Sequence, residues 1–374
     1  MIPFNKPFLT GKETLYIEQA VHSGKISGNG GFTQKCQSFF EEKYGFKKAL
    51  LTTSCTDALE MCALLIDCSY NDEIIVPSYT FVSSALAFAR QGAQIVFADS
   101  EEFHPNVDVK KIEALITNRT KAIVVVHYAG VAVDMDEIMQ LAQKFNLIVI
   151  EDAAQAIDSY YKGKALGSIG HLAAFSFHET KNIIAGEGGL LAINDDKYIS
   201  RSEIIWEKGT NRAAHFRGEI DKYSWVDTGS SFLPSEITAA FLWAQLENLE
   251  TIQNKRKAIW DYYFNGLKSL HESGKLKLPQ VPDYASNNAH MFYLICDSLA
   301  TRSSLIEYLK ETNIHAVFHY LSLNKSEFFL KNNKEESLPN ADHFTDTLVR
   351  LPLYFGLGIT EQKKIIKTIL DFYA

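Results

Sequence analysis

A chain of 374 residues is too long for one ordinary domain and suits a large domain joined to a smaller one. Apolar residues make up 46% and charged residues 22% of the chain, which is typical of a globular protein with a sizeable core. The net charge is −8 and basic residues do not cluster, so nucleic acid and membrane surfaces are not expected as partners.

Cysteine, histidine and apolar patterns exclude further classes. No apolar run approaches the roughly 20 residues that a membrane helix needs, and the residues from Met1 to Lys6 lack a signal-peptide pattern. The five cysteines form no close pair and the eleven histidines show no metal-site spacing, so neither a disulfide framework nor a metal site is expected. We therefore expect a cytoplasmic protein with reduced thiols.

From about residue 48, short apolar runs alternate with helix-length segments at 57–66 and 136–144. Unbroken apolar runs indicate strands covered on both faces, and the alternation favours right-handed βαβ units with a mostly parallel sheet. The last two runs are too close to hold a helix between them, which predicts one antiparallel strand. The predicted strands are 49–52, 73–77, 94–99, 121–128, 147–152, 173–177 and 189–194.

A long helical stretch is expected from Pro234 onward. Proline suits the first turn of a helix, and an apolar stripe at helical spacing continues from Ala239 to Tyr263. We expect this helix to connect a large domain, residues 1–249, to a smaller C-terminal α+β domain, residues 250–374.

Unusual residues follow several of the predicted strands, where ligands of open parallel sheets collect. In the segment 53–59 a strand turns into a helix, whose free N–H groups favour an anion such as a phosphate. Ser54 and Thr56 add hydroxyl groups to this segment. The alternative is a simple helix cap made by Ser54 with Asp57, which is favoured if the segment is taken alone.

Phe81 and Asp152 each follow or end a strand. Phe81 could stack on a planar ring, or it could be an ordinary core residue. Glu151 and Asp152 end an apolar strand with two carboxylates, which is costly unless a positive charge is met there. A protonated ring nitrogen facing Asp152 would meet that cost, and a helix N-cap is the alternative.

Lys181 lies just beyond the strand 173–177 and before a glycine-rich stretch, 186–189. Burial near apolar walls or other cations lowers the pKa of a lysine and makes it a nucleophile. A single lysine is usually a solvated surface charge. The joint order of phosphate-binding turn, aromatic residue, strand-end aspartate and lysine makes a functional role the better interpretation.

Together these segments resemble the DegT/DnrJ/EryC1/StrS family of nucleotide-sugar aminotransferases over essentially the whole chain. The resemblance implies a fold-type I aminotransferase of α/β class, a homodimer that binds pyridoxal 5'-phosphate (PLP). Its motifs lie at 54–56, 77–81, 151–155, 176–181, 186–189, 318–320 and 351–354.

The resemblance also implies roles for individual residues. Lys181 is the catalytic lysine that carries the cofactor as a Schiff base and moves the proton, and Asp152 keeps the ring nitrogen protonated. Phe81 stacks on the ring and Gln155 contacts its 3′-oxygen side. The residues expected to hold the phosphate are Cys55, Thr56 and Ser176.

Four residues are substrate candidates. His178 could carry a second proton or only shape the sugar pocket, and His319 and Tyr320 are expected to line that pocket. Arg217 lies on a polar loop where a diphosphate could be met by cations, although solvation at the surface explains it equally well.

Within the family, the likeness is greatest to the subgroup that uses L-glutamate to aminate C4 of dTDP-4-keto-6-deoxy-D-glucose. It extends to the segments 178–180, 230–231 and 288–290, which have no evident cofactor duty and are expected to shape the substrate pocket. Amination at C3 of a 3-keto isomer is the alternative, because one or two pocket residues can reverse such a preference.

One segment departs from the wider family. Many members carry a GxNxR element before the long helix, but here residues 229–233 read Gly-Ser-Ser-Phe-Leu, so no phosphate ligand is assigned there. A sugar dehydratase of this family has histidine in place of the lysine, and Lys181 argues against that activity. A non-catalytic regulator on the same fold is the alternative of another class.

Overall fold

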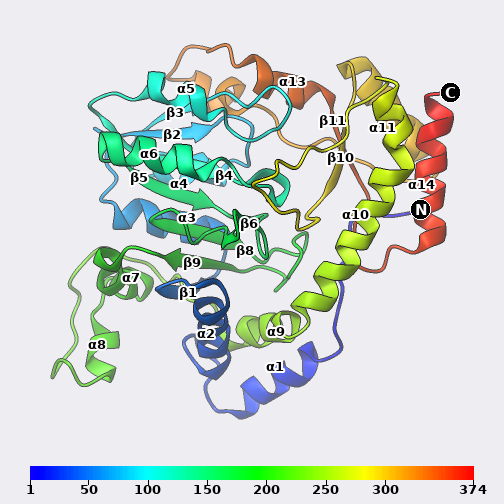
Figure 1. Ribbon diagram of the computed structural model, residues 1–374. Helices are drawn as coiled ribbons and strands as arrows, with labels where there is room; N and C mark the ends of the chain where they lie inside the picture. The colour runs from blue at the N-terminus through cyan, green and yellow to red at the C-terminus, as the bar shows by residue number, and fades with distance from the viewer.

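A computed structural model describes all residues, 1–374, and is built on a seven-stranded sheet of order β1-β9-β8-β5-β4-β2-β3 (Figure 1). All seven predicted strands are present, each end within two residues of its expected place. Only β9 runs antiparallel to its neighbours, as the short β8–β9 connection predicts. The strands are β1 (Lys48–Thr52), β2 (Glu73–Pro77), β3 (Gln94–Ala98), β4 (Thr120–Val126), β5 (Ile148–Asp152), β8 (Leu172–Ser176) and β9 (Gly189–Ile193).

Helices cover both faces of this sheet. Leu51 faces a core shared with α2 (Gly31–Tyr44), α6 (Met135–Phe145) and α9 (Glu236–Leu246). Its neighbour Leu50 faces a second core, shared with α3 (Cys55–Leu65), α4 (Ser83–Ala89) and α7 (Ile199–Trp206). Successive residues of a strand point to opposite faces, so a sheet buried on both faces needs the unbroken apolar runs seen in the sequence.

Other elements surround the sheet. Helix α1 lies against α9, and the segment around α8, which follows α7, projects away from the rest of the molecule (Figure 1). A short hairpin, β6 and β7, follows β5. These additional elements are α1 (Glu13–His22), α5 (Val109–Ile112), β6 (Tyr160–Tyr161), β7 (Lys164–Ala165) and α8 (Arg212–Phe216).

The expected long helix is in fact two helices, α9 and α10 (Leu249–Glu272). The side chain of Asn248 donates to the carbonyl of Ala244 at 3.0 Å, and this local bond competes with continuation of the helix. Pro234 is not in the first turn either: Ser235 caps α9 by accepting from the N–H of Thr238.

A third core lies in the C-terminal part of the chain. The antiparallel pair β10–β11 packs with α10, α11 and α14, and Ile2 joins the same core by pairing with Ile314. The N-terminus therefore lies beside α14 (Figure 1). The division into domains at residue 249 stays a prediction. The elements of this part are β10 (Phe292–Ile295), α11 (Leu299–Glu311), α12 (Glu327–Leu330), α13 (Pro339–Thr347), β11 (Leu348–Leu351) and α14 (Ile359–Phe372).

None of the helices is both long enough and apolar enough to span a bilayer.

Candidate active site

A cleft of about 630 Å³ opens at the carboxyl ends of the central strands. Residues from the sheet, from the N-terminal segment and from the C-terminal part line it together. Ten of the eleven residues predicted for the site lie in its wall: Cys55, Thr56, Phe81, Asp152, Gln155, Ser176, His178, Lys181, His319 and Tyr320.

The start of α3 forms one end of the cleft. The Ser54 hydroxyl accepts from the N–H of Asp57 at 3.1 Å, so the capping interpretation of this segment is confirmed. The first N–H groups of the helix have no intrahelical acceptor and are free for an anion. A Cβ on Gly189 would lie 2.3 Å from the carbonyl carbon of Ser54, so only glycine lets β9 begin this close to the turn. The helix cap made by Ser54 and a phosphate-binding role of this turn are therefore compatible.

Phe81 lies at the cleft with 57% of its surface exposed. The interpretation of Phe81 as an ordinary core residue is thus wrong. An exposed aromatic face beside a cleft suits a planar ring, which would cover it.

Asp152 is almost completely buried, yet it has few partners. Its carboxylate accepts from the Ser84 hydroxyl at 2.6 Å and from the Ala154 N–H at 3.1 Å, and it makes no ion pair. Burial raises the pKa of Asp152. No helix follows β5, so the N-cap interpretation is wrong. A buried carboxylate without a cation fits a cofactor that brings a protonated ring nitrogen.

Lys181 lies in the same cleft, and its Nζ makes neither a hydrogen bond nor an ion pair. Burial lowers the pKa of Lys181, and the charge of Arg350 lowers it further, whereas Cys55 and Asp152 oppose this shift. A lysine with a lowered pKa supplies a neutral, nucleophilic amine more readily than a solvated one. The surface-charge interpretation is therefore wrong.

Gln155 joins the sheet side of the cleft to the C-terminal side. Its Oε1 accepts from the N–H of Ala129 at 2.6 Å, and its Nε2 donates to the Tyr320 hydroxyl at 2.9 Å. The Tyr320 ring stacks on His319 with centroids 3.5 Å apart, and His319 Nδ1 is 2.7 Å from the Tyr128 hydroxyl. One amide hydrogen of Gln155 stays available for a ligand.

His178 sits at the exposed side of the cleft. Its Nδ1 is 2.9 Å from the Thr180 hydroxyl and its Nε2 is 3.7 Å from Glu187. Ser176 is held next to it, accepting from the backbone N–H of His178 at 3.4 Å. These contacts are compatible with either proposed role, proton carrier or pocket residue.

Arg217 is the one predicted site residue that does not line the cleft. It follows α8 on the projecting segment and pairs with Glu203 at 2.8 Å and with Glu219 at 2.7 Å. Two carboxylates already neutralise this guanidinium. Contrary to the prediction, Arg217 does not line the cleft of its own chain.

Other cleft residues were not assigned from the sequence. His290 lies in the wall, as expected for the segment 288–290, and its Nδ1 is 2.9 Å from the side-chain oxygen of Asn182. The Asn182 amide donates to Gln253 and to the carbonyl of Asn288, which fixes its orientation. Arg350, just before the 351–354 motif, was missed because a single arginine at the end of a strand carries no pattern.

The chain resembles known proteins along its whole length. The model of the DegT/DnrJ/EryC1/StrS aminotransferase family matches residues 8–370. The chain belongs to this family. It is 32% identical to the spore coat polysaccharide biosynthesis protein SpsC of Bacillus subtilis strain 168, over 99% of this chain and 96% of that protein.

Two further comparisons agree with the family. GDP-perosamine synthase of Escherichia coli O157:H7 is 31% identical over 100% of this chain and 99% of that protein. The structure of Spr1654 from Streptococcus pneumoniae in its PLP-form has a TM-score of 0.91 and 25% identity, and covers 99% of this chain and 98% of that one. The protein is thus a PLP-dependent sugar aminotransferase.

The residues of this aminotransferase fit PLP at three points: the helix start at Cys55, the exposed ring of Phe81 and the unpaired carboxylate of Asp152. When bound, PLP supplies an electron sink for negative charge on a carbon next to the reacting nitrogen. Asp152 would hold the ring nitrogen in its protonated form. Lys181, as a neutral amine, would take a proton from the α-carbon of the amino donor and deliver it to the cofactor.

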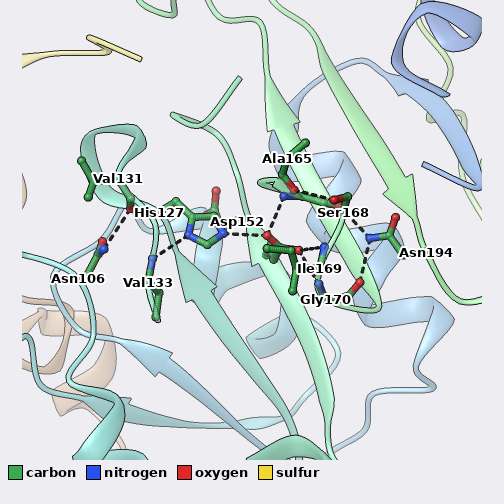
Figure 2. Close-up of polar contacts among 12 residues, drawn as sticks. Asn106, His127, Val131, Val133, Asp152, Ala165, Ser168, Ile169, Gly170 and Asn194 are labelled. Atoms are coloured by element: carbon green, nitrogen blue, oxygen red, sulfur yellow. Dashed lines mark hydrogen bonds and ion pairs between the residues drawn. The ribbon is translucent and has the colours of Figure 1, made fainter. Parts of the chain in front are cut away.

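The opposite face of β5 carries a closed polar network (Figure 2). The Glu151 carboxylate has no exposed surface and lies 2.9 Å from Nε2 of His127. The Nδ1 of His127 accepts from the N–H of Val133, so Nε2 carries the proton that it donates to Glu151. The remaining donors to Glu151 are the backbone N–H groups of Gly167, Ile169 and Gly170.

Proposed function

We propose that this aminotransferase transfers the amino group of L-glutamate to C4 of dTDP-4-keto-6-deoxy-D-glucose, giving dTDP-4-amino-4,6-dideoxy-D-galactose. The same amino sugar is used for enterobacterial common antigen. The observation that supports this choice is the position of His178 and His290 in the cleft. Both come from segments that resemble the C4 transaminases and lie outside the cofactor-binding turns.

The proposal includes roles for the cleft residues. Lys181 and Asp152 are catalytic, and the cofactor contacts come from Cys55, Thr56, Phe81, Gln155 and Ser176. His178, His319 and Tyr320 line the part of the cleft that receives the sugar. Burial lowers the pKa of His319 well below the ordinary value, which favours the neutral ring. Its Nδ1 is taken by the Tyr128 hydroxyl, so Nε2 is the ring nitrogen left for a sugar hydroxyl.

Lys181 can be tested directly. Reduction of the purified holoenzyme with borohydride should bleach its visible absorbance and attach the cofactor to Lys181, as peptide mapping by mass spectrometry would show. A label on any other lysine would contradict the assignment.

Two other sugar substrates are second candidates. A relative 31% identical over the whole chain is named GDP-perosamine synthase, which favours a GDP-linked sugar as one of them. The other is a dTDP-3-keto-6-deoxyhexose, aminated at C3. A difference of a few kcal/mol in transition-state binding is enough to decide between such substrates.

The substrate proposal is tested by offering three ketosugars separately with L-glutamate: the dTDP-4-keto, GDP-4-keto and dTDP-3-keto sugars. We expect kcat/KM to be highest for the dTDP-4-keto sugar, with an axial amine at C4 in the NMR spectrum of the product. Efficient turnover of one of the others, with little on the dTDP-4-keto sugar, would replace the proposed substrate.

The proposal also includes a homodimer, in which the segment 229–232 reaches the neighbouring subunit. The projecting segment exposes large apolar side chains, among them Trp225 at 81% and Phe216 at 69%, which is unusual for a free surface. Sedimentation should give a dimer, and Trp225→Ser should weaken it. A fully active monomer would contradict this part of the proposal.

A further inference from the structure

The segment 288–290, just before β10, places His290 in the wall of the cleft within a rigid turn. Ala289 adopts the left-handed backbone conformation with a φ of 52°, which is unfavourable for a residue with a side chain. Arg256 of α10 donates to the carbonyls of both Ala289 and His290 and so holds this turn. A strained turn that the rest of the chain holds in place is typical of a functional site.

The amide of Asn182 is oriented by a group whose role in a hydrogen bond is fixed. The backbone carbonyl of Asn288 can only accept, and it lies 2.9 Å from Nδ2 of Asn182. That atom is therefore the NH₂ group, and it also donates to Oε1 of Gln253 at 2.8 Å. The oxygen of the Asn182 amide is thus the atom that faces His290.

This orientation decides which nitrogen of His290 carries a proton. Nδ1 lies 2.9 Å from Oδ1 of Asn182, and an amide oxygen can only accept, so Nδ1 is the donor. Burial lowers the pKa of His290 well below its ordinary value, which keeps the ring neutral. The charges that act on it, from Lys181, Arg256 and Arg350, are all positive and lower the pKa further. Nε2 is left with an unprotonated lone pair.

The free Nε2 is on the side of the ring that faces the cleft. Asn182 is not part of the cleft wall, so Nδ1 points away from the cleft and the far edge of the ring, which includes Nε2, lines it. Only 8% of the His290 surface is exposed, and no group of the protein donates to Nε2. A nearly buried acceptor without a donor indicates that a ligand supplies the donor.

The ligands of the reaction differ in what they offer to a lone pair. The carboxylates of an amino acid and the keto oxygen of a sugar are acceptors, so they do not bind there. An ammonium group can donate, but the positive charges around His290 disfavour a further cation. A sugar hydroxyl is a neutral donor. Whether C3 or C4 is aminated, a 6-deoxy ketosugar carries a hydroxyl on a carbon next to the reacting one.

We propose that Nε2 of His290 accepts a hydrogen bond from the sugar hydroxyl next to the keto carbon, and that Asn182 is the positioning residue that keeps this nitrogen unprotonated. Asn182 directly follows Lys181 in the chain, so the bound hydroxyl holds the keto carbon at the reacting end of the cleft. The inference rests on the proposed function only in that the substrate is a ketosugar with such a hydroxyl, which all the candidate sugars have.

The kinetic test uses the holoenzyme and follows the two half-reactions separately through the cofactor spectrum. L-glutamate alone gives the donor half, and the ketosugar added to the aminated enzyme gives the sugar half. The variants are His290→Phe, which removes the acceptor, and His290→Gln, whose amide oxygen can accept near the position of Nε2. The control is His171→Phe, which replaces a half-buried histidine outside the cleft whose Nδ1 accepts from the N–H of Val149.

Loss of one hydrogen bond predicts that kcat/KM of the sugar half falls about tenfold in His290→Phe. Its donor half and both halves of His171→Phe should change by less than about threefold, and His290→Gln should recover part of the sugar half. An unchanged sugar half, or a comparable loss in the donor half, would overturn the proposal.

A substrate analogue without the neighbouring hydroxyl identifies the group that His290 binds. This analogue should lower the sugar half about tenfold in the wild-type protein, because the buried acceptor is then left unpaired. In His290→Phe the same analogue should cost less than about threefold, since the hydrogen bond is already absent. Equal losses in the two proteins would overturn the proposal.

Nitrogen NMR of the protein labelled with ¹⁵N-histidine tests the positioning role without turnover. Protonated and unprotonated ring nitrogens have separate resonances, and His290→Gln identifies the signals of His290. In the wild-type protein Nε2 should be unprotonated at neutral pH, and Asn182→Ala should populate the other tautomer. A protonated Nε2 in the wild-type protein would overturn the proposal. An incorrect sugar in the proposed function changes which ketosugar is turned over but not this tautomer, so the two failures are distinguishable.

Discussion

Glu151 and Asp152 are neighbours on one strand, both buried, and their surroundings are opposite. Glu151 receives three backbone N–H groups and the Nε2–H of His127 on the closed side of the sheet. Asp152 receives one hydroxyl and one N–H on the cleft side. The donors hold the pKa of Glu151 below its ordinary value despite its burial, whereas burial raises the pKa of Asp152.

The difference separates a structural carboxylate from a catalytic one. On the closed side the protein itself satisfies the charge, and the network ties β5 to the turn after β7, where Asn194 holds the carbonyls of Gly167 and Gly170 (Figure 2). On the cleft side, neither the carboxylate of Asp152 nor the guanidinium of Arg350 has an oppositely charged partner. A polar group that is buried and incompletely paired by its own chain marks where a ligand belongs.

Asp152→Asn should have the largest effect on catalysis. An amide cannot hold a protonated ring nitrogen, so turnover should fall by about 1000-fold in a steady-state assay. Near-normal turnover would mean that Asp152 only supports the strand end.

The same variant should stabilise the cofactor-free protein. The pKa of Asp152 is raised on folding, so its ionised form opposes folding at neutral pH, and removing the charge relieves this. We expect a melting temperature higher by about 2 °C in the apo form. A lower melting temperature would show that Asp152 is satisfied without the cofactor.

Glu151→Gln should have the opposite effect, because it should lower the stability of the protein rather than its turnover. One of its oxygens becomes an NH₂ group facing N–H donors, so the free energy of unfolding should fall by about 3 kcal/mol in urea titrations. Since the pKa of Glu151 is lowered, its stabilising effect is present above about pH 4.3 and is lost as the pH falls through the folded-state value. A loss of turnover without a loss of stability would contradict the assigned role.

Ser84→Ala should have a smaller effect, confined to the cleft side. Asp152 would keep only the N–H of Ala154, so the orientation of the carboxylate is lost and kcat should fall about tenfold. The matched control is Ser168→Ala on the closed side, where the hydroxyl donates to the carbonyl of Ala165. Similar kcat values for the two variants would remove the distinction between the two sides.

The smallest expected effect concerns pH. Burial lowers the pKa of His319, so below about pH 6.5 the unfolded chain binds a proton that the folded chain does not. Stability should therefore decrease on acidification by up to about 1.4 kcal/mol per pH unit. Urea titrations of the apo protein at pH 6.5 and 5.5 should show a weaker decrease for His319→Gln. An unchanged decrease would mean that His319 is protonated in the fold.

Much of the site was predictable because its residues stand at the ends of predictable strands. Seven apolar runs located β1 to β5, β8 and β9, and strand direction placed Asp152 and Lys181 at one edge. The family motifs then indicated PLP as the cofactor. The break at Asn248 was not predictable, since the apolar stripe continues across it and the side-chain bond from Asn248 to Ala244 follows no sequence pattern.

The sequence by itself determined the mostly parallel sheet, its one antiparallel strand and the family, because period and motif are local properties of the chain. Ten of the eleven residues that it predicted for the site do line the cleft. Only the tertiary structure decided which charged side chains have partners within the protein. Glu151 has four donors and Asp152 has two, and Arg217 pairs with two carboxylates whereas Arg350 pairs with none. Most of these partners come from segments distant in sequence. Burial and hydrogen-bond partners are set by packing, and they distinguish a structural charge from one that waits for a ligand.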